Sequence, residues 1–251
     1  MTDHAPRPSA GSPLGSPDDP VTTARRVRDM FAAVAPRYDF LNHLLSLRRD
    51  IAWRCATARG LREVLAKPGS VAVDVCCGTG DLAAALGRYS AGVVIGTDFC
   101  HPMLRQAREK FARSSRVFFL EADTLALPFP DASLDVVSVA FGFRNLADYA
   151  RGLEEMRRVL KPAGWLAILE FSRLQWPILS PLFRFYFHRI LPQVGTWISG
   201  VAGPYQYLPG SVSRFPDQKS LAAALREAGF GNVRYRNFSG GIAALHLGQR
   251  V

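Results

Sequence analysis

The chain has 251 residues and a net charge of +10, and 48% of its residues are hydrophobic, enough to bury a large core. Its mean hydropathy is +0.03 and no apolar run reaches 18 residues, which argues against membrane-spanning helices. The N-terminus lacks the basic-then-apolar pattern of a secretion signal, so we expect a cytoplasmic protein. The basic residues are scattered and match no helix-turn-helix or RNP pattern, so we expect no nucleic-acid partner.

The four cysteines predict neither a disulfide framework nor a metal site. They are Cys55, Cys76, Cys77 and Cys100. Adjacent side chains of a strand point to opposite faces, so Cys76 and Cys77 are poorly placed to hold one ion together. The sequence also contains no CxxC or HxxxH motif. We interpret the cysteines as small apolar residues and expect no metal.

The first part of the chain shows no strand pattern. Residues 1–22 contain five prolines with serine and glycine between them, a composition that predicts a disordered tail. Residues 23–40 are predicted to be helical with a break at Pro36, and residues 41–66 are predicted to be a second helix.

After residue 66, short apolar runs alternate with helical segments, which predicts parallel strands covered by helices on both faces. Five strands are expected, at 71–76, 92–98, 116–123, 134–141 and 165–171. Two further strands flank the turn Ser239–Gly241 and predict a C-terminal hairpin. The expected fold class is therefore α/β: a seven-stranded, mostly parallel sheet in a domain at 67–251, with an antiparallel C-terminal hairpin and residues 23–66 as a helical cap.

The segment DVCCGTGD, residues 74–81, joins the first predicted strand to a helix. Such a turn directs backbone N–H groups toward a ligand, and Gly78 and Gly80 would let that ligand approach closely. Asp98 ends the second strand, 18 residues after Gly80, where a carboxylate can accept hydrogen bonds from both hydroxyls of an adenosine ribose. This pattern fits NAD and S-adenosylmethionine alike. The alternative is that Asp98 caps the following helix.

Two further acids favour the sulfonium donor over the dinucleotide. Asp74 precedes the first glycine by four residues, where a carboxylate suits the amino group of a bound amino acid and repels a pyrophosphate. Asp123 lies just past the third strand, within reach of an adenine amine. Alternatively, Asp123 is a solvated loop carboxylate.

Several segments resemble known families. DVCCGTGD, GTD, EADTLALPFPD and VLKPAGWLAILEF together resemble the class I S-adenosylmethionine-dependent methyltransferases, which implies a Rossmann-like fold; Cys76 replaces the glycine that usually opens their motif. More specific are FAAVAPRYDFLNHLLSL (31–47), FGFRNLAD (141–148), YLP (207–209) and FPDQKSLAAALREAGF (215–230), which resemble the ubiquinone and menaquinone biosynthesis C-methyltransferase family. The resemblance extends from about residue 27 to the C-terminus.

This resemblance implies transfer of a methyl group from S-adenosylmethionine to a ring carbon of demethylmenaquinol. The alternative is the 2-polyprenyl-6-methoxy-1,4-benzoquinol step of ubiquinone biosynthesis, or both activities. The positions that match donor-binding residues of the family are Gly78, Thr79, Gly80, Asp98, Asp123 and Thr124. Ala140 stands where the family often has a donor-contacting serine, so a contact there would have to come from backbone.

The resemblance assigns catalysis to Arg144, Asn145 and Tyr38. Arg144 is permanently charged and could stabilise a quinolate or orient a water that takes the proton. Tyr38 could donate to the substrate oxygen or pack on the sulfonium. Each has a structural alternative: Arg144 pairs with Asp148 or Glu155, Asn145 caps the next helix, and Tyr38 is a wedge between helices.

Residues 171–216 contain no acid, four arginines and ten aromatic residues. We expect this insert to form a groove for a prenyl tail and to touch an anionic membrane surface from the cytoplasmic side. The residues expected to bind substrate are Phe141, Tyr186, His188 and Tyr205, and His188 and His246 are possible bases. Alternatively, the insert covers the sheet edge or forms a homodimer surface.

Two rival functions are an RNA-binding protein or RNA methyltransferase and an NAD-dependent reductase. The first is disfavoured because the sequence lacks a catalytic-cysteine or Asn-Pro-Pro-type motif and because the acid-free insert suits lipid. The second shares the glycine turn and Asp98, so those residues do not exclude it.

Overall fold

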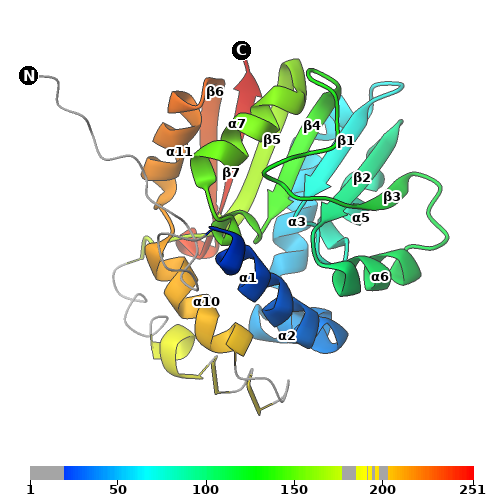
Figure 1. Cartoon of the computed structure of the whole chain (residues 1–251). Helices are drawn as coiled ribbons and strands as arrows, with labels where there is room; N and C mark the ends of the chain where they lie inside the picture. The colour runs from blue at the N-terminus through cyan, green and yellow to red at the C-terminus, as the bar shows by residue number, and fades with distance from the viewer. Residues whose placement is uncertain (1–19, 177–184, 191, 194–195, 198–202) are drawn as a thin grey trace, which may run out of the picture.

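A computed structural model describes residues 20–176, 185–190, 192–193, 196–197 and 203–251. Its centre is one seven-stranded sheet with the order β3-β2-β1-β4-β5-β7-β6 (Figure 1). The strands are β1 (Val71–Val75), β2 (Val93–Asp98), β3 (Val117–Glu121), β4 (Leu134–Ala140), β5 (Leu160–Phe171), β6 (Phe230–Phe238) and β7 (Ala243–Arg250). Strands β1–β5 run parallel to one another, and β7 runs antiparallel to both β5 and β6. The predicted sheet with its C-terminal antiparallel pair is confirmed.

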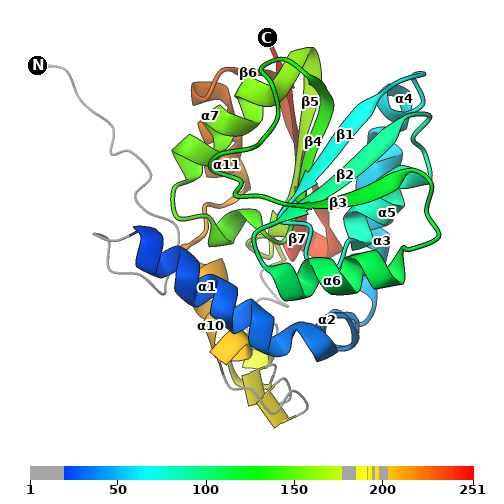
Figure 2. The ribbon, with the colours of Figure 1, turned by 45° about the vertical axis from the view of Figure 1, so that its right-hand side comes forward.

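Helices cover both faces of the sheet, as expected for strands that are apolar on both sides. One face packs on α3 (Arg49–Gly60), α4 (Arg62–Leu65) and α5 (Asp81–Gly87), through side chains such as Trp53, Leu65 and Leu86. The other face packs on α7 (Tyr149–Val159) and α11 (Gln218–Glu227), through side chains such as Met156 and Leu225. Figure 2 shows these two layers on opposite sides of the central strands.

The carboxyl ends of the parallel strands are covered by a separate group of helices. These are α1 (Pro20–Val34), the short 3-10 helix η1 (Ala35–Arg37), α2 (Tyr38–Leu45) and α10 (Gly203–Arg214), and α6 (His101–Lys110) adjoins them. In Figure 1 this group lies below the sheet, at the end where β1–β5 terminate. Val34, Leu41 and Met103 form a small core that joins the group together.

The single helix predicted for residues 41–66 is wrong. Leu47 and Arg48 have positive φ angles of 52° and 60°, and the Arg48 amide donates to the His43 carbonyl oxygen at 2.7 Å, which ends α2 and turns the chain into α3. Neither residue is a glycine or an asparagine, so the sequence carries no signal for this break. Only the first half of the expected cap therefore lies over the strand ends, because α3 and α4 pack on the sheet.

The expected alternation also fails between β3 and β4, where residues 122–133 form a loop and not a helix. Pro128 and Pro130 cannot occupy a helix interior. Arg158 stabilises the loop, since its Nη1 donates to the Phe129 carbonyl oxygen at 2.9 Å and its Nη2 to the Leu127 carbonyl oxygen at 3.0 Å. The loop keeps Asp123 at the carboxyl end of β3.

The insert at 171–216 is only partly described. Its described elements are the end of β5, one π-helical turn η3 (Tyr186–Ile190) and α10. Trp176, Phe185 and Trp197 are exposed to solvent. No helix in the described ranges is long and apolar enough to cross a bilayer.

Candidate active site

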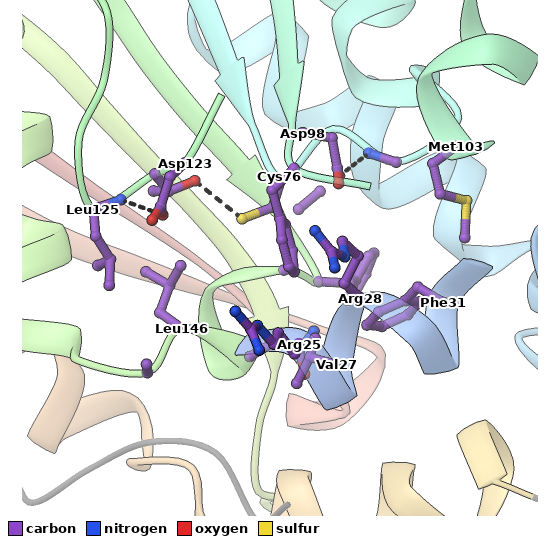
Figure 3. A pocket seen from close by; sticks show the side chains of 18 of the residues that line it. Arg25, Val27, Arg28, Phe31, Cys76, Asp98, Met103, Asp123, Leu125 and Leu146 are labelled. Carbon is purple, nitrogen blue, oxygen red and sulfur yellow. Dashed lines mark hydrogen bonds between the residues drawn. The ribbon is translucent and has the colours of Figure 1, made fainter. Parts of the chain in front are cut away.

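A cavity of about 330 Å³ lies at the carboxyl ends of β1, β2 and β4, between the sheet and α1 (Figure 3). Eight of the residues singled out from the sequence line it: Tyr38, Gly78, Asp98, Asp123, Thr124, Ala140, Phe141 and Asn145. Other lining residues were not predicted, among them Arg25, Arg28, Phe31, Met103 and Leu146. Arg25, Arg28 and Phe31 could not be found from periodicity, because their place depends on how α1 docks on the sheet.

The glycine turn after β1 forms one edge of this cavity. Gly78 and Gly80 have positive φ angles of 55° and 86°, a conformation that glycine adopts without strain. A Cβ atom on Gly80 would lie 2.7 Å from the Phe119 ring, so only glycine fits there. Cys76 also has a left-handed conformation, with a φ of 50°, which costs a non-glycine residue about 1–2 kcal/mol.

Asp98 is buried at the end of β2 and holds the turn in place. Its Oδ2 accepts a hydrogen bond from the Gly78 amide and its Oδ1 one from the Cys100 amide, both at 2.8 Å. Burial raises the pKa of this carboxyl to about 6, against the lowering effect of these amides. The side chain does not cap α6, although it accepts from the residue just before that helix. Its position on the cavity wall suits a hydroxyl-bearing ligand.

Asp123 and Thr124 lie at the end of β3 on the other side of the glycine turn. Asp123 Oδ1 accepts from the Leu125 amide at 2.9 Å, which fixes the carboxylate against the cavity. Thr124 Oγ1 lies 3.3 Å from Cys76 Sγ, so the two strand ends touch through these side chains. Figure 3 shows Asp98 and Asp123 on the sheet side of the cavity, flanking Cys76.

Three of the predicted donor-binding residues do not line the cavity. Asp74 is buried within the sheet and its Oδ1 accepts from Ser138 Oγ at 2.7 Å, and burial raises the pKa of Asp74 to about 7. The Phe119 ring occupies the space that a side chain on Gly80 would need. Thr79 is buried, and its hydroxyl donates a hydrogen bond to Asp39. These residues shape the turn from behind.

An ionic cluster ties α2 to the turn and to α6. Asp39 Oδ2 accepts from Lys110 Nζ at 2.7 Å, while Asp39 Oδ1 accepts from Thr79. Lys110 also bonds Asp81, at the start of α5. Burial alone would lower the pKa of Lys110, but the hydrogen bonds with Asp39 and Asp81 outweigh it and raise that pKa. The helix that carries Tyr38 is thus anchored beside the cavity.

Arg144 lies behind the cavity wall, on the 3-10 turn η2 (Phe143–Asn145). Its Nη1 donates to Glu170 Oε1 at 2.8 Å and to the carbonyl oxygen of Phe141. Burial raises the pKa of Glu170, and the charge of Arg144 opposes that rise. The partner is therefore neither Asp148 nor Glu155. Glu170 is the only acid in the apolar strand WLAILEF, and a lone acid in such a strand signals a buried partner.

Asn145 and Tyr38 both line the cavity, Asn145 from η2 and Tyr38 from the start of α2. Asn145 Oδ1 accepts from Tyr207 Oη at 3.0 Å, and the side chain that caps α7 is Asp148, so the capping alternative for Asn145 is wrong. Tyr38 packs edge-on against Phe31, with ring centroids 6.0 Å apart. Burial raises the pKa of the Tyr38 hydroxyl, against the positive charges of Arg144 and Arg54.

The predicted substrate residues are brought together only in part. Phe141 lines the cavity with a positive φ of 59° and its ring lies 4.7 Å from that of Phe171. Tyr186 packs on the small core of α1, α2 and α6 and is not among the lining residues. The side chains of His188 and Tyr205 lie outside the described residues. His246 is buried on β7 with its Nε2 2.9 Å from the Gln218 carbonyl oxygen, so it does not reach the cavity as a base.

The fold is that of Rossmann-like methyltransferases. A SAM-dependent methyltransferase from Aquifex aeolicus matches with a TM-score of 0.57 and 22% identity over 78% of this chain and 89% of that one. A methyltransferase of Thermotoga maritima described as a possible histamine N-methyltransferase matches with a TM-score of 0.59 and 18% identity, over 87% of this chain and 100% of its own.

The chain belongs to the ubiE/COQ5 methyltransferase family, whose model matches residues 20–250. The demethylmenaquinone methyltransferase of Thermus thermophilus is 48% identical over 88% of this chain and 100% of that protein. The one of Deinococcus radiodurans is 45% identical over 95% of this chain and 97% of its own. The protein is thus an S-adenosylmethionine-dependent methyltransferase, and the reductase reading is wrong.

Proposed function

We propose that the protein transfers the methyl group of S-adenosylmethionine to a ring carbon of demethylmenaquinol. Relatives that match over most of the chain carry this activity in their names. The observation that carries the proposal is one cavity in which the glycine turn, Asp98 and Asp123 face Tyr38 and Asn145. The first group suits an adenosyl ligand and the second a phenolic one.

The donor side fits the residues present. Gly78 leaves room for close approach, since the nearest atom to a Cβ there would be in the Tyr38 ring at 3.9 Å. Asp98 would accept from the ribose hydroxyls and Asp123 from the adenine amine. S-adenosylmethionine, when bound, supplies an electrophilic methyl group, so the protein needs to position the acceptor carbon and raise its nucleophilicity.

The acceptor side is built to stabilise negative charge on a quinol oxygen. A phenol ionises near pH 10, so a ring carbon gains nucleophilicity when nearby groups favour the phenolate. Tyr38 would donate to that oxygen, and Asn145 would orient it, held by Tyr207. Arg144 acts from behind the wall, because its buried charge lowers the pKa of Tyr38 against the effect of burial and its bond to Phe141 fixes the loop that carries Asn145.

The surface beside the cavity suits an anionic bilayer, where a prenylated quinol resides. On α2, Leu41 is buried while Phe40 and Leu44 are 61% and 43% exposed, and Leu47, in the turn after α2, is 79% exposed. This segment is therefore apolar toward solvent as well as toward the interior. Arg48 and Arg49 are exposed at the end of this stripe. Together with the exposed aromatics of the insert, this stripe would hold the protein on the cytoplasmic face of a membrane and admit the prenyl tail.

The activity is tested with the purified full chain, labelled donor and two acceptors, demethylmenaquinol and 2-polyprenyl-6-methoxy-1,4-benzoquinol. We expect label in the naphthoquinol and at least tenfold less in the benzoquinol. Asp98→Asn should weaken S-adenosylhomocysteine binding in calorimetry by about tenfold or more, since an ionised acceptor is lost. Labelling of neither quinol by a protein that binds S-adenosylhomocysteine would refute the acceptor but not the donor.

The membrane surface is tested separately by sedimentation with vesicles. Phe40→Ser with Leu44→Ser should reduce binding to phosphatidylglycerol vesicles several-fold. Phe118→Ser, which removes an equally exposed side chain from the edge strand β3, should not. A change in oligomeric state without a change in vesicle binding would identify the stripe as a homodimer surface instead.

A further inference from the structure

We propose that Arg25 and Arg28 of α1 form a carboxylate-binding subsite of the cavity, which holds the α-carboxylate at the amino-acid end of the donor. This inference rests on the proposed function only in taking the ligand to be an adenosyl amino acid. Both residues lie within the range that the family model matches, but upstream of residues 31–47, the first of the segments quoted for the resemblance.

The geometry of α1 brings both arginines to one wall. Arg25 and Arg28 are three residues apart, so they lie on the same side of the helix. Val27 and Phe31 complete that wall, and Val27 is buried against the interior. Figure 3 shows these four residues on the α1 side of the cavity, across from Asp98 and Asp123 on the sheet side.

The charges of the cavity are therefore divided between its two walls. Asp98 and Asp123 on the sheet side repel a carboxylate. Among the lining residues that the structure describes, Arg25 and Arg28 are the cationic ones. A ligand that carries an adenosine at one end and a carboxylate at the other is thus oriented with its adenosine toward the sheet and its carboxylate toward α1.

Both arginines are available for this contact. The other cations near the cavity are already engaged, since Arg144 pairs with Glu170 and Arg54 with Asp50. Arg28 has only a long contact of 3.8 Å with the exposed Asp29, and within the described ranges no ion pair engages Arg25. A guanidinium binds a carboxylate through two parallel N–H···O bonds, which gives orientation as well as affinity.

The test compares two ligands that share an adenosine and a thioether and differ in the amino-acid end. S-adenosylhomocysteine has the carboxylate, and 5′-methylthioadenosine lacks the whole amino-acid group. We expect Arg25→Gln with Arg28→Gln to weaken S-adenosylhomocysteine binding in calorimetry by about tenfold to a hundredfold, the loss of charge-assisted bonds. Binding of 5′-methylthioadenosine should change by less than twofold.

The matched control is Arg105→Gln, an exposed arginine of α6 that does not line the cavity. It removes one positive charge near the cavity and should leave both affinities unchanged. Arg28→Lys in place of Arg28→Gln should restore part of the loss, because it returns a positive charge to that position. Equal weakening of both ligands, or no weakening of either, would overturn the carboxylate subsite. If the wild-type protein binds neither ligand, the proposed donor itself is wrong, an outcome that the wild-type titration separates from the failure of the arginines.

Discussion

Arg144 and Glu170 form a buried ion pair directly behind the cavity wall, with Nη1 and Oε1 2.8 Å apart. The same guanidinium donates to the Phe141 carbonyl oxygen, and the Arg144 amide donates to Glu170 Oε2 at 3.3 Å. One pair thus joins the end of β5 to the loop after β4. The loop that presents Asn145 therefore depends on a charge that never reaches the cavity surface.

Glu170→Ala should be strongly destabilising, because it leaves the Arg144 charge buried and unpaired. We expect the free energy of unfolding to fall by about 3–5 kcal/mol in urea titrations. Glu170→Gln keeps an acceptor for Arg144 and should cost less. Asp131→Ala serves as the control, since its pair with Arg158 is exposed and should be worth less than about 1 kcal/mol. Equal losses at both sites would contradict a special role for the buried pair.

Cys76 and Gly142 should be energetically coupled. A Cβ atom on Gly142 would lie 2.4 Å from the Cβ of Cys76, so Gly142→Ala should destabilise the protein by about 1–3 kcal/mol. Cys76→Gly removes the obstructing atom and the positive-φ strain, so much of that cost should vanish in the double variant. A double-mutant cycle in urea measures the coupling, which we expect at about 1 kcal/mol or more.

Cys76→Ala is the control for this cycle, because it shortens the side chain but keeps its Cβ atom. It should therefore fail to rescue Gly142→Ala. Purely additive free energies in the Cys76→Gly background would show that the loop after β4 moves away from the turn instead of colliding with it.

The sheet was predictable because its signals are local. Apolar runs such as VAVDV and VVIGTD are strands wherever they are buried on both faces, and glycines at 78 and 80 predict a tight turn between strand and helix. Asp98 and Asp123 follow directly from strand ends, since the carboxyl ends of parallel strands meet at one edge. The prediction of Asn145 rests on the resemblance of FGFRNLAD to the family.

The remainder depends on contacts between distant segments. Glu170 lies 26 residues from Arg144, and no spacing rule joins an acid on one strand to a base after another. Arg28 reaches the cavity only because α1 docks on the strand ends. The break at Leu47 and Arg48 requires positive φ angles at residues that rarely adopt them, so a helix prediction runs through it.

Asp74 should make the stability of the protein depend on pH. Burial raises its pKa from 3.8 to about 7 in the folded state, so between those values the folded protein holds a proton that the unfolded chain releases. Stability therefore falls as pH rises through this window and is level above it. Asp74→Asn removes the titration, so its stability relative to wild type should improve by up to about 3 kcal/mol between pH 4.5 and 7.5. If the difference in unfolding free energy between Asp74→Asn and wild type, measured by urea titration, is the same at both pH values, then Asp74 stays ionised.

The same carboxyl offers a test of the predicted contact between Asp74 and the donor's amino group. A cation placed near Asp74 would lower its pKa, so binding of S-adenosylhomocysteine near pH 6.5 should release a proton. Calorimetry in two buffers of different ionisation enthalpy measures that release. Asp74→Asn should abolish it, whereas Asp98→Asn should retain part of it. Binding without proton release would leave Asp74 as a purely structural residue beneath the turn.

Lys110 should control how firmly α2 is held beside the cavity, because it bridges Asp39 of α2 and Asp81 of α5. Lys110→Gln breaks both pairs and leaves two carboxylates facing each other, so Tyr38 and the turn lose their common anchor. We expect S-adenosylhomocysteine to bind about three- to tenfold more weakly, mainly through faster dissociation in stopped-flow measurements. Lys161→Gln is the matched control, since Lys161 pairs with Asp135 at 2.8 Å far from the cavity and is similarly exposed. If both lysine variants change the dissociation rate alike, the effect comes from net charge, and the anchoring of α2 plays no part in holding the donor.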